Sequence, residues 1–136
     1  MDLAPSPYNG LCYCQGALAP AGVDVDAGIR ELAPHIHYAH FRNVSGTADN
    51  FPETFHDNGD LDMPALMRAY KESGFSGPMR PDHAPSLAGK TNETPGYETL
   101  GKLHAIRYMK GLCTIRLVFL TVEYDPSDKR PRYGGA

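Results

Sequence analysis

The central strand of the chain is predicted in the sequence His35-Ile-His-Tyr-Ala-His-Phe-Arg-Asn-Val44, which has the composition of a β-strand through Phe41. Side chains alternate between the two faces of a strand. One face therefore carries Ile36, Tyr38, His40 and Arg42. The opposite face carries His35, His37 and Phe41. If the first face is the inner one, His40 and Arg42 point into a shared site, and the other two histidines face the surrounding helices.

Two further strands are predicted, one before and one after this stretch. Leu11–Cys14 is a short apolar run bounded by Asn9-Gly10 and Gly16, and a second short run spans Gly77–Pro81. Long polar loops follow the second and third strands, over residues 45–60 and 82–95. Loops of this length inside a compact domain are often functional.

Three amphipathic helices alternate with these strands. The first spans Asp24–Leu32 and is stopped by Pro34. The second begins near Asp62, which can cap it, and ends at Gly74. The third runs from Tyr97 to Leu112. The apolar stripe of the second helix consists of Met63, Leu66, Met67 and Tyr70. That of the third consists of Leu100, Leu103, Ile106 and Met109.

The alternation of strands and helices predicts parallel βαβ units, with polar residues on the loops that follow the strands. A (β/α) barrel places its sites on those loops, and a doubly wound sheet does the same. No glycine-rich phosphate fingerprint follows any strand, so the barrel is favoured. A complete barrel needs about 250 residues. The predicted fold is therefore a partial (β/α)8 TIM barrel with about three C-terminal βα units.

Composition excludes several classes of protein. The 136 residues carry a net charge of −3 without a clustered basic excess, so we expect no nucleic-acid partner. No apolar run approaches the roughly 20 residues that span a bilayer, and the N-terminus lacks the layout of a signal peptide. We therefore expect no membrane partner and a cytoplasmic location. Cys12, Cys14 and Cys113 are odd in number and are expected to be reduced thiols.

Candidate metal ligands lie at the carboxyl end of each predicted strand. Cys14 ends the first strand, His40 lies near the end of the second, and Asp82-His83 follows the third. A strand cysteine usually packs in a core and an isolated histidine is more often structural, but the three equivalent positions converge on one point. A set of thiolate, imidazole and carboxylate suits Mn²⁺, Fe²⁺, Co²⁺ or Zn²⁺.

A structural zinc site is the alternative for the same region. Cys12, Cys14, His35, His37 and His40 include suitable ligand types. Structural sites usually use C-x₂₋₄-C spacing, however, and a single residue separates the two cysteines. His35 and His40 have a suitable spacing but face opposite ways on a strand. The zinc reading is therefore disfavoured.

Three more side chains are candidates for binding a substrate. Arg42 is a natural clamp for a carboxylate through bidentate pairing, and Arg80 has the same capacity because its strand parity matches that of Asp82. His56, in the first long loop, could hydrogen-bond a substrate or shuttle a proton. The plainer alternatives are surface ion pairs for the two arginines and an exposed loop histidine for His56.

Several short motifs occur in order along the chain: Cys14-Gln-Gly-Ala, His40-Phe-Arg-Asn-Val44, Phe55-His56, Gly59-Asp-Leu-Asp-Met63, Met79-Arg-Pro-Asp-His83 and Gly96-Tyr97. In order and spacing they resemble the C-terminal half of the mannonate dehydratase family, over about residues 5 to 112. The tail over residues 113–136 does not resemble a family ending. Its β-rich core, Ile115 to Val122, could add a strand where the barrel is open or could be unrelated sequence.

The resemblance implies a xylose-isomerase-like TIM barrel that dehydrates D-mannonate to 2-keto-3-deoxy-D-gluconate in hexuronate breakdown, with Mn²⁺ or a similar ion such as Fe²⁺ or Co²⁺. The family's metal ligands correspond to Cys14, His40 and Asp82. Its acid/base candidates correspond to His83 and Tyr97. Its substrate contacts correspond to Arg42 and His56. A metal can stabilise the enediolate that forms beside the substrate carboxylate, and a positioned acid can protonate the departing hydroxide.

A further histidine ligand and further substrate contacts of the family come from strands that would precede Met1. The resemblance therefore implies lineage more firmly than activity of the isolated chain, and we expect either a homo-oligomer or a missing N-terminal half to complete the barrel. One alternative is a non-catalytic metal-binding or interaction fragment. Another is a sugar isomerase or epimerase on the same barrel type, disfavoured because those sites are usually richer in Glu and Asp ligands.

Overall fold

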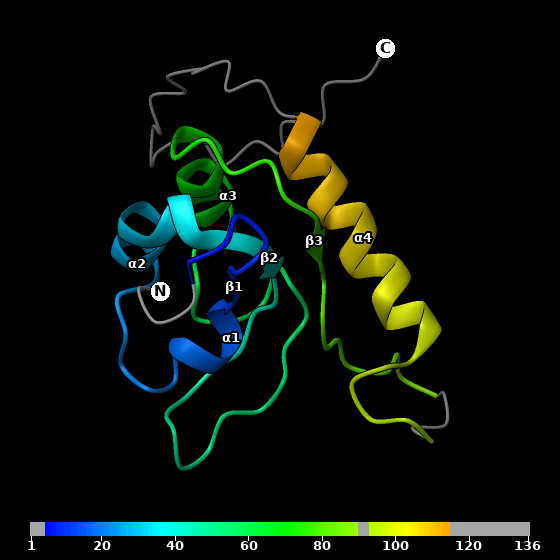
Figure 1. The fold of residues 1–136 in the computed structure, drawn as a ribbon. Coiled ribbons are helices and arrows are strands. Elements are labelled where there is room, and N and C mark those ends of the chain that lie inside the picture. The colour runs from blue at the N-terminus through cyan, green and yellow to red at the C-terminus, as the bar shows by residue number, and fades with distance from the viewer. Residues whose placement is uncertain (1–4, 90–92, 115–136) are drawn as a thin grey trace, which may run out of the picture.

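The computed structural model describes residues 5–89 and 93–114. Figure 1 shows the elements in chain order. They are β1 (Leu11–Cys14), α1 (Gln15–Leu18), α2 (Val25–Leu32), the 3₁₀ helix η1 (Ala33–His35), β2 (Ile36–His40), α3 (Met63–Glu72), β3 (Met79–Arg80) and α4 (Thr99–Thr114). In these residues, no helix has the length and apolar character that crossing a membrane requires.

The three strands form one parallel sheet in the order β1-β2-β3. Cys14 pairs with His40, and His40 pairs with Arg80, so the carboxyl ends of the strands are aligned. For the three strands among residues 5–89 and 93–114, chain order and spatial order are the same, without the reversal that defines a doubly wound sheet. The predicted parallel α/β arrangement is confirmed.

An irregularity in the pairing of β1 with β2 corrects the predicted faces of β2. Leu11 pairs with Ile36 and Cys12 pairs with Tyr38, so His37 is left without a Cα partner. Because this extra residue reverses the alternation, Ile36 joins the buried core instead of sharing the face of His40. His35 belongs to η1 and not to the strand, and both His35 and His37 are exposed.

The helix starts are confirmed by their caps. Asp24 accepts a hydrogen bond from the backbone N–H of Ala27 at 3.0 Å, and Asp62 accepts one from Ala65 at 2.9 Å. Each carboxylate thereby satisfies an amide that the first turn of the helix leaves without a partner. At the other end of α3, Gly74 has a φ of 76°. That left-handed conformation ends the helix and turns the chain towards β3.

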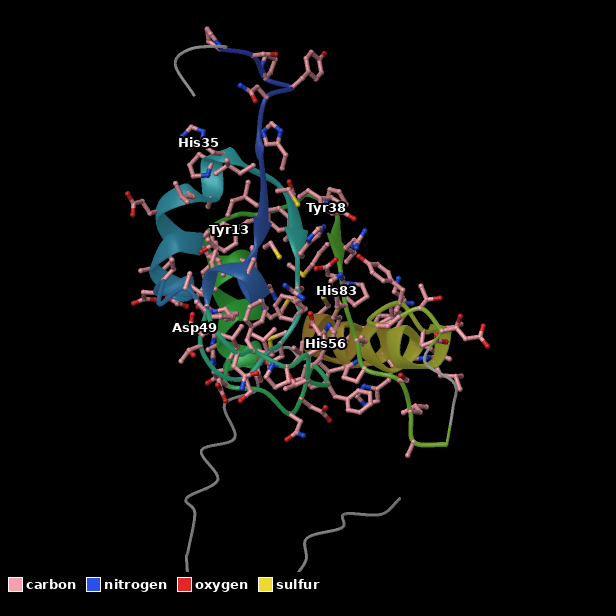
Figure 2. All side chains as sticks on the ribbon, turned by 90° about the horizontal axis from the view of Figure 1, so that it is seen from below. Tyr13, His35, Tyr38, Asp49, His56 and His83 are labelled. Carbon is pink, nitrogen blue, oxygen red and sulfur yellow. The ribbon has the colours of Figure 1, made fainter. Side chains whose placement is uncertain are left out.

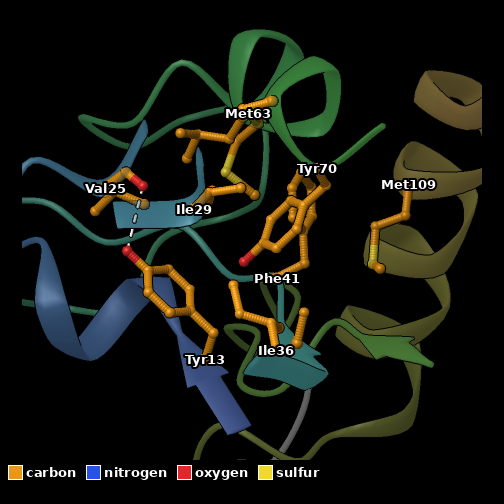
Figure 3. Close-up of a cluster of buried hydrophobic side chains, with 11 residues drawn as sticks. Tyr13, Val25, Ile29, Ile36, Phe41, Met63, Tyr70 and Met109 are labelled. Atoms are coloured by element: carbon orange, nitrogen blue, oxygen red, sulfur yellow. Dashed lines mark hydrogen bonds between the residues drawn. The ribbon is translucent and has the colours of Figure 1, made fainter. Parts of the chain in front are cut away.

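The hydrophobic core lies on one face of the sheet (Figure 3). The strands contribute Tyr13, Ile36 and Ala39, with Phe41 just beyond β2, and the helices contribute Val25, Ile29, Met63, Leu66, Ala69, Tyr70 and Met109. The Tyr13 hydroxyl donates to the Val25 carbonyl at 3.2 Å, which ties β1 to α2. The helices α2 and α3 therefore cover this face, whereas the opposite face of the sheet carries the polar side chains.

The last helix differs from its predicted form. It begins at Thr99 instead of Tyr97, and its buried residues are Gly101, Ala105 and Met109. The predicted stripe is wrong for the first three of its members, because Leu100, Leu103 and Ile106 are 42%, 51% and 41% exposed. Hydrophobic spacing identified the helix but not the side that packs against the described residues.

The third strand is shorter than predicted, and the helix that follows it crosses a predicted boundary. Only Met79–Arg80 pairs with β2, and the flanking Pro78 and Pro81 have no N–H to extend the ladder. Helix α4 continues to Thr114, so the expected division between residues 112 and 113 falls within a helix. The rest of the predicted tail, including the possible strand from Ile115 to Val122, lies outside the described residues.

Candidate metal and acid–base site

Three potential metal ligands converge at the carboxyl end of the sheet. Cys14 ends β1, His40 ends β2, and Asp82 lies two residues beyond β3. One ligand atom from each lies within 4.8 Å of the others. The Asp82 Oδ2 atom is 4.0 Å from Cys14 Sγ and 3.5 Å from His40 Nδ1. The three residues predicted from strand ends are therefore brought together.

The chemistry of these three groups fits a divalent transition metal, because thiolate, imidazole and carboxylate are its usual protein ligands. Burial lowers the pKa of His40, against the opposing effect of Asp82, so that the ring is neutral at neutral pH. A neutral imidazole is the form that binds a metal. The two oxygens of Asp82 have different partners. Oδ2 faces the other two ligands, and Oδ1 accepts a hydrogen bond from Arg80 at 2.5 Å.

Asp82 has the only positive φ, 58°, among the non-glycine residues that the structure describes. A left-handed backbone is uncommon outside glycine, although Asp and Asn tolerate it better than most residues. Directly after the short strand β3, this conformation turns the chain so that Asp82 is 6% exposed among its partners. Backbone conformations of this kind concentrate at functional sites.

Arg42 lies under the site and not on its surface. Its side chain is 8% exposed, pairs with Glu53, and has Nε 3.4 Å from Asp82 Oδ2. Gly16, in α1, lies directly against this side chain, and a Cβ there would overlap it. The buried Gln15 donates to the Arg42 carbonyl at 3.1 Å. Gln15 and Gly16 thus hold Arg42 in place, the first through the Arg42 carbonyl and the second by packing against its side chain.

A second group of polar side chains extends from Arg42 to the loop before α4. His83 Nδ1 is 2.9 Å from Glu53 Oε1 and also 2.9 Å from Arg42 Nη1. On the other side of the ring, His83 Nε2 is 2.7 Å from the Tyr97 hydroxyl. His83 and Tyr97, the predicted acid/base candidates, are therefore in direct contact next to the three ligands.

His56 occupies a different place from the one expected of a loop histidine. It is completely buried, and its Nε2 lies 3.1 Å from the Pro81 carbonyl. A carbonyl only accepts, so Nε2 carries the proton. Burial lowers the pKa of His56, against backbone hydrogen bonds at Phe41 and Pro81, which favours this neutral form. His56 thereby holds the segment just before Asp82, near His83 at the same end of the sheet (Figure 2).

The loop that carries Glu53 and His56 is held by Asn43. The Asn43 amide donates to the carbonyls of His56 and Leu61, at 3.1 and 3.2 Å. Its oxygen accepts from the backbone N–H of Val44 and of Leu61, both at 3.0 Å. All the hydrogen-bonding capacity of this buried amide is used to close the loop.

Sequence reasoning missed three residues that build the site: Gln15, Asn43 and Glu53. Gln15 and Asn43 lie inside motifs already quoted, and Glu53 lies three residues before His56 in the same loop. Their role depends on which loop folds back over which strand end, and that information is not local. An amide or carboxylate residue within or close to such a motif is the sequence signal that could have found them.

The chain was compared with protein families and with proteins of known structure. Residues 1–117 match the family model described as D-mannonate dehydratase (UxuA). Mannonate dehydratase of Enterococcus faecalis is 36% identical over 116 residues, which cover 82% of this chain and 32% of that protein. Mannonate dehydratase of Brachyspira hyodysenteriae is 38% identical over 112 residues, which cover 79% of this chain and 31% of that protein.

The crystal structure of mannonate dehydratase from Streptococcus suis serotype2 superposes with a TM-score of 0.74 at 33% identity, covering 82% of this chain and 33% of that one. The chain thus spans about a third of the length of the curated relatives that it matches. The residues matched by the family model, 1–117, include the strands and loops that bring the site together. The chain belongs to the mannonate dehydratase family.

Proposed function

We propose that this chain carries part of the active site of a metal-dependent hydro-lyase that converts D-mannonate to 2-keto-3-deoxy-D-gluconate. The observation that carries the proposal is the convergence of Cys14, His40 and Asp82 beside the paired His83 and Tyr97. The three-stranded sheet, with its helices on one face, would form part of the wall of a (β/α)8 barrel. Its polar face would then line the interior, at the strand ends where barrel enzymes hold their sites.

Cys14, His40 and Asp82 would hold Mn²⁺, or Fe²⁺ or Co²⁺ in its place. Such an ion supplies Lewis-acid stabilisation for negative charge that develops next to the substrate carboxylate. These three would be the ligands that the described residues supply, and the further histidine that the resemblance implies would come from the segment that completes the barrel. Arg80 and Arg42 neutralise part of the negative charge of Asp82 and hold its carboxylate in place.

His83 and Tyr97 would carry out the two proton transfers of the dehydration. One proton leaves the carbon next to the carboxylate, and one is delivered to the departing hydroxyl group. The side chain of His83 is 30% exposed and Tyr97 is 43% exposed, so both can reach a substrate. Their 2.7 Å contact also allows a proton to pass between the two groups.

Arg80 is the better placed of the two arginines for the substrate carboxylate. Its side chain is 40% exposed at the edge of the site, whereas Arg42 is buried and already has Glu53 and Asp82 as partners. We propose that Arg42 and the fully buried His56 act from behind the site, by holding Asp82 and the Pro81 carbonyl. A direct role in substrate contact is assigned to Arg80.

We further propose that a second protein segment completes the barrel, either another copy of this chain or an N-terminal half. Among the described residues, β1 and β3 each pair on one edge only, so their outer edges carry backbone groups without a strand partner. Light scattering across a range of concentrations tests the homo-oligomer. A strictly monomeric chain that binds metal would exclude it.

The proposed function is tested with the purified chain, Mn²⁺ and D-mannonate. Formation of a 2-keto acid, together with loss of Mn²⁺ affinity of about tenfold or more in Cys14→Ala, would support it. Cys113→Ala, a cysteine on α4 away from the ligands, is the matched control and should bind Mn²⁺ as the parent chain does. Unchanged affinity in Cys14→Ala would remove the metal site from the proposal.

A second candidate is a metal-binding fragment without catalysis. It is favoured by one fact, that the chain spans about a third of its relatives and offers three described ligands. The same experiment separates the two functions. Metal binding that depends on Cys14, without any 2-keto acid at high protein concentration, would establish the second.

A further inference from the structure

We infer that Glu53 is a positioning residue that holds His83 as the Nδ1–H tautomer and so leaves the Nε2 lone pair directed at Tyr97. The tautomer follows from contacts within this chain. Its catalytic consequence rests on the proposed function. No prediction from sequence pointed to Glu53, which lies in the loop between β2 and α3, 30 residues before His83 in the chain.

The backbone of the loop places Glu53 at the site. Glu53 forms an antiparallel bridge with Val44, which lies four residues beyond the end of β2. Its carboxylate then reaches Arg42 and His83 through the same atom, Oε1. The second oxygen, Oε2, is buried and has no hydrogen-bond partner among the residues described. The carboxylate therefore acts at one point, between a guanidinium and an imidazole.

The chemistry of these groups selects the tautomer. A carboxylate only accepts hydrogen bonds, a guanidinium only donates them, and a neutral imidazole has one nitrogen of each kind. If Nδ1 carried a lone pair, it would face the negative Oε1 atom at 2.9 Å, which is repulsive. If Nδ1 carries the proton, the same contact is a charge-assisted hydrogen bond.

Arg42 favours the opposite tautomer. Its Nη1 atom lies as near to His83 Nδ1 as Glu53 Oε1 does, at 2.9 Å, and would favour a lone pair on Nδ1. The Nη1 atom of Arg42 already has Glu53 Oε1 as an acceptor, and the nearby Asp82 compensates the guanidinium charge without a hydrogen bond to Nε. Arg42 therefore gains little from a lone pair on His83 Nδ1, whereas Glu53 Oε1 gains a hydrogen-bond donor if Nδ1 carries the proton. The balance favours the Nδ1–H tautomer. Removal of Glu53 should reverse this balance and let Arg42 donate to Nδ1.

The consequence appears at the other ring nitrogen. With the proton on Nδ1, Nε2 accepts, and the Tyr97 hydroxyl 2.7 Å away donates to it. Gly96 approaches the His83 ring, since a Cβ there would lie 3.2 Å from it, so the backbone brings Tyr97 close. Glu53, His83 and Tyr97 thus form a carboxylate–imidazole–phenol sequence, in which the carboxylate orients the base. The same logic orients the histidine in hydrolase triads.

The test is ¹⁵N NMR of the histidine ring nitrogens in the full chain without a paramagnetic metal. The measurement is made at about pH 9, well above the ordinary pKa of histidine, so that tautomers are compared and not charge states. His83→Gln identifies the His83 signals. We expect a protonated Nδ1 and an unprotonated Nε2 in the parent chain. A ring protonated at Nε2 would overturn the inference.

Two variants and a control complete the test. Glu53→Ala should convert most of His83 to the Nε2–H tautomer, and Glu53→Gln, which keeps the size of the side chain, should give a mixture. Asp57→Asn removes a negative charge from the same loop, but Asp57 lies 4.0 Å from His104 instead of His83. It should leave the His83 tautomer unchanged. An Nδ1–H ring in both Glu53 variants would show that Glu53 does not set the tautomer.

An activity measurement then separates this inference from the proposed function. If the chain dehydrates D-mannonate, Glu53→Gln should lower kcat by about tenfold with less than about a twofold change in KM. A KM effect alone would mean that Glu53 acts on substrate binding through Arg42. If no dehydration is measured, the proposed function fails while the tautomer result still stands.

Discussion

Helices α3 and α4 each have an apolar stripe in the sequence, the clearer one in α3, but only the stripe of α3 lies throughout in or against the core. In α3, Met63, Leu66 and Tyr70 lie in the core against the sheet. In α4, Leu100, Leu103 and Ile106 are exposed, and the helix rests instead on Gly101, Ala105 and Met109. Helix α3 therefore packs through large side chains along its length, whereas α4 packs by close backbone approach at Gly101 and through a large side chain only at Met109 among its buried residues.

The difference shows what hydrophobic spacing can determine. Spacing defines a helix and one apolar face, because residues three and four apart lie on the same side. Which side is buried depends on the neighbours that the rest of the chain provides. Helix α3 has the sheet and α2 beside it, whereas in the first half of α4 Gly101 lies against Ala84 and Pro85, and the exposed His104 contacts Phe55. The following predictions test this contrast from the largest expected effect to the smallest.

Leu66→Ala should cause the largest loss of stability. The side chain is 4% exposed in the core, and truncation removes its transfer free energy and leaves a cavity. We expect the free energy of unfolding to fall by about 2–5 kcal/mol, measured by urea denaturation followed by circular dichroism. A loss below about 1 kcal/mol would mean that α3 does not depend on its large side chains.

Gly101→Ala should destabilise the chain although alanine is the better helix former. A Cβ at this position would overlap the Pro85 carbonyl oxygen and lie 3.4 Å from the Ala84 Cβ, so α4 would have to move away. We expect a loss of about 1–3 kcal/mol in the free energy of unfolding. The measurement is the same urea denaturation.

The matched control is Gly111→Ala in the same helix. A Cβ at Gly111 would meet nothing within 4 Å, so only helix propensity acts. This variant should be more stable than the parent by about 0.5–1 kcal/mol. Opposite signs for the two substitutions would establish that α4 packs by close approach. Stabilisation by both would contradict it.

His56→Gln should change how stability depends on pH. Burial lowers the pKa of His56 below its ordinary value of 6.5, so the unfolded chain takes up a proton at a higher pH than the folded chain. The parent is therefore fully stable with respect to this group above about pH 6.5 and loses stability as the pH falls below it. The variant, whose amide can still donate to the Pro81 carbonyl, should lose less between pH 6.5 and 5 in thermal unfolding. Parallel curves would show that His56 does not titrate on unfolding.

The strands, the cap of α3 and the grouping of the three candidate metal ligands could be predicted because their signals are local. Asp62 caps α3 as the sequence indicates, and Cys14, His40 and Asp82 lie at or just beyond the ends of strands whose carboxyl ends meet in a parallel sheet. Local patterns therefore determined most of the candidate site. They did so without any knowledge of the loops.

The rest depended on contacts between distant segments. The extra residue His37 reversed the alternation of β2, because the register with β1 shifts between Leu11 and Cys12. Glu53 acquired its place from a bridge to Val44 and from partners 11 and 30 residues away. The burial of His56 and the exposure of Leu103 likewise depend on which distant segments pack against each residue and which do not. No spacing rule within one element contains that information.

Leu103→Ala should have the smallest effect of these substitutions and is the most informative about α4. The side chain is 51% exposed, and alanine is as good a helix former as leucine. Truncation should therefore change the free energy of unfolding by less than about 0.5 kcal/mol. Measurement at two protein concentrations sharpens the result. A larger loss that appears only at the higher concentration would show that a second copy covers this stripe, and α4 would then resemble α3 in its assembled form. A larger loss at both concentrations would mean that the chain itself covers Leu103, and the contrast between the two helices would be withdrawn.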